Sequence, residues 1–99
     1  MQVIFEYHDV SASERLEALA TEKLEHLKLK FDFVHRADVF FKTENRSDSE
    51  EQICDIRLSL PGPRIFASTN ANSFSAAITE TINDLEDQLR KKKEKMKSY

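Results

Sequence analysis

Four segments of the chain have the residue pattern of β-strands. Residues 2–7 and 51–60 alternate hydrophobic and polar side chains, which is typical of strands with one buried face. Residues 35–44 combine β-branched and aromatic residues, and 64–69 form a shorter run of the same kind. The Pro61-Gly62-Pro63 cluster between the last two segments predicts a tight turn, and therefore a hairpin.

Two other segments repeat hydrophobic residues every three or four positions, as amphipathic helices do. The first extends from about 13 to 31, after the possible N-caps Ser11 and Ser13. The second begins near Phe74, keeps a clear apolar stripe to Leu89 and continues thinly to Met96. Its last two turns are expected to project beyond the sheet as a basic rod.

The resulting order is β-α-β-β-β-α, with a polar loop at 45–49 between the second and third strands. Two helices on one face of a four-stranded antiparallel sheet bury all the apolar stripes economically, so we predict an α+β two-layer sandwich. The core is expected to contain Cys54 and the phenylalanines, which are Phe31, Phe33, Phe40 and Phe41.

Composition excludes several classes of protein. The chain has 99 residues, enough for one domain, and its single cysteine excludes an internal disulfide or a CxxC site. No apolar run approaches the ~18 residues of a membrane span, and the N-terminal residues lack the features of a secretory signal. We therefore expect a cytoplasmic protein with Cys54 reduced and no association with membranes.

Enzymatic constellations are not recognisable. The histidines His8, His26 and His35 lack metal-ligand spacing, and the single glycine lies between prolines rather than in a phosphate-binding loop. We therefore predict no catalytic activity, no metal or other cofactor, and no small-molecule substrate.

Charge is distributed unevenly along the chain. The net charge is −3, but residues 90–97 contain six positive side chains and one negative, which leaves −8 for the remainder. One or two cations suffice to complement a helix dipole, so six exceed that requirement. The concentration of cations suggests that the end of the second helix binds an anionic partner.

The first helix adds to this candidate surface. Lys23, His26 and Lys30 lie on one flank of its apolar stripe and Lys28 on the opposite side. These cations could instead pair with Glu22 and Glu25 along the helix. RNA phosphates suit lysines on two adjacent helices, because A-form RNA is recognised largely by shape and backbone. The candidate RNA-binding residues are Lys23, His26, Lys28, Lys30, Arg90, Lys91, Lys92, Lys93, Lys95 and Lys97.

Several motifs resemble one known family. Residues 85–95, LEDQLRKKKEK, resemble the LERQLRKHKEK stretch of the ribosome hibernation-promoting factor family, also called ribosome-associated inhibitor A or sigma-54 modulation protein. Residues 66–68 and 76–78 are similar to its HAS and YAAID segments. The entry to the first helix and its lysine-leucine pattern match as well, at Val10, Ser13, Lys23, Leu24 and Leu27. Asp87 stands where the family motif has arginine.

The resemblance implies a fold similar to double-stranded-RNA-binding domains and a function in translation. Such proteins bind ribosomal RNA of the small ribosomal subunit at the subunit interface. They block the channel for transfer RNA and messenger RNA during stationary phase or stress. Residues 1–99 would form a single ribosome-binding domain, as in the family's short form without a C-terminal dimerisation domain. The alternatives are a protein-interaction module, with the acidic surface docking a basic partner, or a diverged relative that no longer binds ribosomes.

Overall fold

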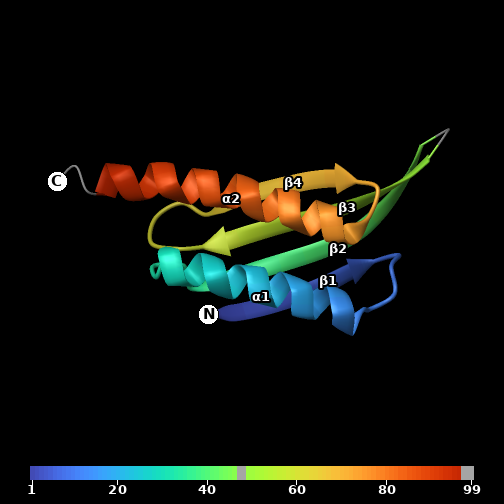
Figure 1. Cartoon of the computed structure of the whole chain (residues 1–99), viewed down its shortest axis with the longest axis horizontal. Coiled ribbons are helices and arrows are strands. Elements are labelled where there is room, and N and C mark those ends of the chain that lie inside the picture. The colour runs from blue at the N-terminus through green and yellow to red at the C-terminus, as the bar shows by residue number, and fades with distance from the viewer. Residues whose placement is uncertain (47–48, 97–99) are drawn as a thin grey trace.

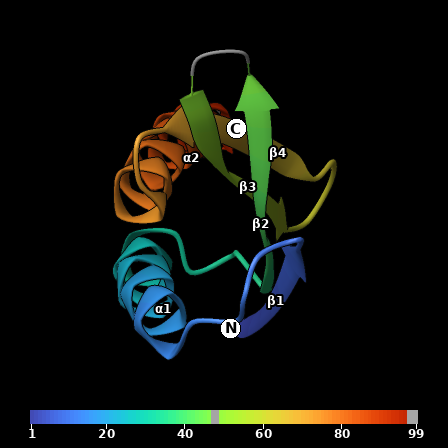
Figure 2. The same ribbon diagram turned by 90° about the vertical axis from the view of Figure 1, so that its right-hand side faces the viewer.

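The computed structural model describes residues 1–46 and 49–96 and has the predicted order of elements (Figure 1). The elements are β1 (Gln2–His8), α1 (Glu14–Lys30), β2 (Arg36–Arg46), β3 (Ser49–Ser59), β4 (Ile65–Ala71) and α2 (Phe74–Met96). The strands form one four-stranded sheet in the order β1-β2-β3-β4. Both helices lie on the same face of this sheet, so the architecture is the predicted two-layer sandwich (Figure 2).

The sheet is mixed, and the expectation of a fully antiparallel sheet is wrong. β2 pairs with β3 and β3 with β4 in antiparallel register, but β1 pairs with β2 in parallel. The reason is the connection, because α1 carries the chain back to the starting end of β1 before β2 begins. Phe5, Val39, Ile56 and Ala67 occupy consecutive paired positions across the sheet, in a row that joins the core.

The hairpin formed by β2 and β3 is longer than the polar residues at 45–49 suggest. β2 continues to Arg46 and β3 starts at Ser49, with these two residues paired. The predicted loop is therefore mostly strand, and residues 47–48 lie outside the described part of the chain. Antiparallel pairing satisfies the backbone whatever the polarity of the side chains, which explains the extension.

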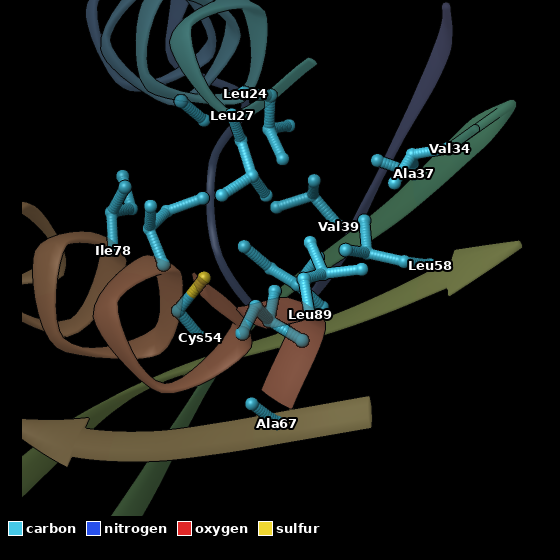
Figure 3. Packing of buried hydrophobic residues seen from close by; sticks show 14 of the residues in the cluster. Leu24, Leu27, Val34, Ala37, Val39, Cys54, Leu58, Ala67, Ile78 and Leu89 are labelled. Carbon is cyan, nitrogen blue, oxygen red and sulfur yellow. The ribbon is translucent and has the colours of Figure 1, made fainter. Parts of the chain in front are cut away.

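The core lies between the two layers, and its side chains interdigitate there (Figure 3). Cys54 points into it and is fully buried, as predicted. Phe31 and Phe41 are also buried, and Phe33 packs edge-on against Phe31 with ring centres 6.1 Å apart. The prediction for Phe40 is wrong. Adjacent strand residues point to opposite faces, so Phe40 lies on the helix-free face, with the Arg57 guanidinium 6.0 Å from its ring centre.

Local capping and one buried hydroxyl fix the position of α2. The Ser73 hydroxyl accepts a hydrogen bond from the Ala76 amide at 3.1 Å, which caps the helix N-terminus. Further along, the buried Thr81 hydroxyl lies 2.7 Å from the carbonyl oxygen of Ala77 and 3.1 Å from that of Cys54 in β3. This hydroxyl therefore links the helix to the sheet.

Both helices run toward the same end of the molecule, and the last turns of α2 continue past the β3–β4 connection (Figure 1). The C-terminal end of α1 lies beside this part of α2, which brings Lys30 next to the basic residues of α2. Within residues 1–46 and 49–96, neither helix is apolar over the length that crossing a membrane requires.

Candidate nucleic-acid interface

The cations near the end of α2 lie on two different flanks of the helix. Lys91, Lys92 and Lys95, together with Gln88, follow the three- and four-residue spacing of one helix face. Arg90 and Lys93 follow the same spacing on the flank that faces α1. These two flanks have different electrostatic surroundings, and this difference decides which cations are available to a ligand.

The flank that faces α1 is neutralised by carboxylates. Glu86 accepts from Lys30 of α1 at 3.2 Å and from Arg90 at 2.9 Å, so it bridges the two helices. Arg90 also pairs with Asp87 at 2.9 Å. Lys30 and Arg90 are both predicted RNA contacts, and their carboxylate partners Glu86 and Asp87 were missed in the sequence. The four-residue spacing of Glu86 and Arg90 is the signal that was available.

Two further lysines donate hydrogen bonds to backbone carbonyls at or just after the end of α1. The Lys93 ammonium donates a hydrogen bond to the carbonyl oxygen of Lys30 at 3.1 Å and lies 5.6 Å from the ring centre of Phe31. The Lys28 ammonium donates to the carbonyl oxygens of Asp32 and, at 2.7 Å, Val34. The last carbonyls of a helix have no partner within it, and Lys93 satisfies one of them, whereas Lys28 satisfies two carbonyls in the segment that follows α1.

The opposite flank of α2 presents the three lysines that we call the outer lysine row, Lys91, Lys92 and Lys95. None of them forms a salt bridge with the side chain of any residue in 1–44 or 51–96. They border a hollow of about 440 Å³ whose other lining residues are Ile65, Gln88 and Met96. The hollow contains no carboxylate among these residues, so its electrostatic potential favours anions.

The β3–β4 connection lies against this row. Gly62 has a φ of +92°, a conformation that suits glycine between two prolines. A Cβ atom at this position would lie 3.7 Å from the Lys92 ammonium nitrogen, so the connection and the lysine are neighbours. The turn predicted from the sequence thus lies next to Lys92.

The remaining candidate residues are distributed as follows. Lys23 is partly exposed and, seven residues before Lys30, lies on the same flank of α1; it has no salt bridge to a described residue. His26 lines a hollow with Met1 and Leu29 on the β1 side of α1, so the structure does not bring it together with the outer lysine row. Lys97 lies outside the described residues.

The alternative that the α1 lysines pair along their own helix is wrong for the described contacts. Lys30 reaches across to Glu86 and Lys28 reaches backbone carbonyls, while neither Glu22 nor Glu25 forms a salt bridge with them. Tertiary contacts at the helix end therefore replace i, i+4 pairs for Lys28 and Lys30.

Fold and surface together define a small α+β protein with a lysine-rich surface at the end of its last helix. The chain belongs to the family described as sigma 54 modulation protein / S30EA ribosomal protein, whose model matches residues 3–97. This is a family of ribosome-associated factors rather than of enzymes.

Similar proteins include the ribosome hibernation promoting factors of Klebsiella oxytoca and of Escherichia coli strain K12. Each is 30% identical to this chain over 99 residues, which is 100% of both sequences. The Pseudomonas putida factor of the same name is 30% identical over 98 residues, covering 99% of this chain and 92% of its own length.

Solved structures agree with the fold. A ribosomal subunit interface protein from Coxiella burnetii superimposes with a TM-score of 0.83 at 25% identity, covering 94% of this chain and 98% of its own. The N-terminal domain of Thermus thermophilus Protein Y gives a TM-score of 0.75 at 18% identity over 92% of this chain and 98% of its own, which supports the fold alone.

Proposed function

We propose that this protein acts in ribosome hibernation by binding the small ribosomal subunit at the subunit interface, through phosphates of ribosomal RNA. Occupation of the channel used by transfer RNA and messenger RNA would then silence translation during stationary phase or stress. Family membership over residues 3–97 and the full-length similarity to named hibernation promoting factors support a ribosomal role. Because ribosomes are in the cytoplasm, the protein would act there. Residues 1–99 would form one ribosome-binding domain.

The observation that carries the proposal is the outer lysine row. Three adjacent ammonium groups without carboxylate partners attract phosphates strongly, because no internal salt bridge has to break first. Lysine suits this role, since it acts as a point charge that adapts to the spacing of phosphates. Lys23 is the α1 residue best placed to join them, because it too lacks a described carboxylate partner.

The cations on the α1-facing flank contribute differently. Lys30 and Arg90 bind RNA only by exchanging Glu86 or Asp87 for a phosphate, so part of their attraction is offset by the lost ion pairs. Lys28 and Lys93 hold the end of α1 and shape the surface rather than provide its main charge. Of the predicted contacts, Lys91, Lys92 and Lys95 are therefore expected to contribute most to RNA affinity.

Charge elsewhere in the chain is consistent with an oriented complex. The body of the protein is acidic, whereas the end of α2 is basic. A molecule with this asymmetry approaches RNA with the basic end leading, since the acidic body is repelled by phosphates. The acidic surface would then face solvent or basic ribosomal proteins.

Competition on purified small subunits tests the channel mechanism. The wild-type protein should displace a bound transfer RNA and messenger RNA fragment from the subunit, with a dose dependence that matches its own binding. The variant Lys91→Glu/Lys92→Glu/Lys95→Glu should fold normally and displace neither. Simultaneous binding of protein and both RNAs would overturn the channel mechanism, and undiminished binding of the variant would overturn the role of the lysine row.

A further inference from the structure

The hollow beside the outer lysine row has an apolar part that phosphate binding alone does not require. Ile65 at the start of β4 and Met96 at the end of α2 line it together with the lysine stems. Met96 leaves 49% of its surface exposed, so it offers apolar surface beside the three ammonium groups. The hollow's volume of about 440 Å³ falls within the range of roughly 300–1,000 Å³ that is typical of small-molecule sites.

The wall nearest β4 is held in place. The Gln88 amide donates hydrogen bonds to the carbonyl oxygen of Phe66 at 3.1 Å and to the carboxylate of Asp84 at 2.8 Å. The hollow thus lies between β4 and α2, and the hydrogen bond from Gln88 to Phe66 connects these two elements next to it. Lysine ammonium groups border the hollow, and the side chains of Ile65 and Met96 line its apolar part. This arrangement suits a ligand that is anionic at one end and has a flat, apolar face at the other.

From this combination we propose that the hollow holds one unpaired nucleotide of the bound RNA. Its phosphate lies among Lys91, Lys92 and Lys95, and the face of its base lies against Ile65 and Met96. The inference rests on the proposed function and specifies the RNA further. An uninterrupted duplex keeps its bases stacked inside, whereas a bulge or loop presents a base that a side chain can cover.

The occupant is part of an RNA strand rather than a free nucleotide. The hollow is open, and its polar groups are Gln88 and three lysines that are at least partly exposed, so a single nucleotide would gain few contacts against the entropy lost on binding. A nucleotide within a strand is already held near the surface by neighbouring phosphates, which raises its effective concentration at the hollow.

Two RNA hairpins that are identical except for one bulged 2-aminopurine nucleotide provide the test. We expect the wild-type protein to bind the bulged hairpin about fivefold more tightly, which corresponds to roughly 1 kcal/mol, and to change the 2-aminopurine emission on binding. Met96→Ala should reduce this preference to less than about twofold while its affinity for the unbroken hairpin stays the same. Leu29→Ala, which removes an apolar side chain that is 84% exposed on α1, is the matched control. It should change neither the preference for the bulged hairpin nor the affinity for the unbroken one.

The outcomes separate this inference from the proposed function. Equal binding of both hairpins with unchanged emission overturns the nucleotide site but leaves RNA binding by the lysine row intact. Equal loss of preference in Met96→Ala and Leu29→Ala also overturns it, because the effect is then not local. Efficient competition by millimolar adenosine monophosphate would identify a free-nucleotide site and overturn the assignment to an RNA strand. Failure to bind either hairpin or the small subunit would count against the proposed function itself.

Discussion

Lys93 of α2 closes the end of α1 by donating a hydrogen bond from its ammonium group to the carbonyl oxygen of Lys30 at 3.1 Å. The same ammonium group lies 5.6 Å from the ring centre of Phe31, the residue that follows the helix. Two cations that are close in the basic segment thus have different roles, since Lys91 lies on the opposite flank in the outer lysine row.

Replacing Lys93 should therefore affect stability, and replacing Lys91 should not. Lys93→Ala removes a charged donor from the helix end and is expected to lower the free energy of unfolding by about 1 kcal/mol. Lys91→Ala, a matched deletion two residues away, should change it by less than about 0.5 kcal/mol. Urea denaturation measures both values, and equal destabilisation by the two changes would contradict the assigned contact.

Burial raises the pKa of the Cys54 thiol to about 12, and the nearby Asp55 charge adds to this shift. A thiol whose pKa is higher in the folded state favours folding fully below its unfolded pKa of roughly 9, and this contribution is lost as the pH rises toward 12. The free energy of unfolding should therefore fall by about 1 kcal/mol between pH 8 and pH 10 through this group alone.

Cys54→Ala isolates the effect. The variant is less stable at pH 8 because it leaves a small cavity, but the difference from wild type should narrow by about 1 kcal/mol at pH 10. Urea denaturation of both proteins at the two pH values provides the comparison. A constant difference between them would show that the thiol does not contribute to the pH dependence.

Asp87 reduces the positive charge available to RNA, because its carboxylate pairs with Arg90 at 2.9 Å. Asp87→Asn should lower the dissociation constant for small subunits about two- to threefold at low salt, with a smaller gain as salt screens the charge. Glu80→Gln, an exposed change of the same charge earlier in α2, is the control. If both variants bind small subunits more tightly by the same factor, total charge rather than the Asp87–Arg90 pair controls affinity.

Much of the fold can be predicted from the sequence because side-chain periodicity reports burial directly. The first helix, expected at about 13–31, extends over Glu14–Lys30, and the second continues to Met96 as predicted. The parallel pairing of β1 with β2 was missed, since periodicity identifies the buried face of a strand but not its direction. Phe40 and Phe41 are a similar case, because composition alone does not tell which of two adjacent aromatics faces the core.

The sequence shows where the cations of the candidate site are concentrated, but not which of them form ion pairs. The basic end of α2 is evident from the residues themselves, whereas the division of its cations depends on contacts between distant segments. Lys30 and Glu86 are 56 residues apart, so their ion pair follows only from the packing of the two helices. The apolar side of the hollow has the same origin, since Ile65 and Met96 meet through the tertiary fold.

The salt dependence of small-subunit binding tests the central claim most directly, when measured for Lys92→Glu and Arg15→Glu. Both variants lose the same charge, but Arg15 lies near the start of α1, where it donates a hydrogen bond to Ser75 at 3.2 Å. If about four phosphates are neutralised, wild-type affinity should fall about 100-fold between 50 and 200 mM salt. Lys92→Glu should bind at least about tenfold more weakly with a shallower slope, and Arg15→Glu should resemble wild type. Equal weakening by both variants, or a wild-type slope in Lys92→Glu, would contradict the assignment of the outer lysine row to RNA.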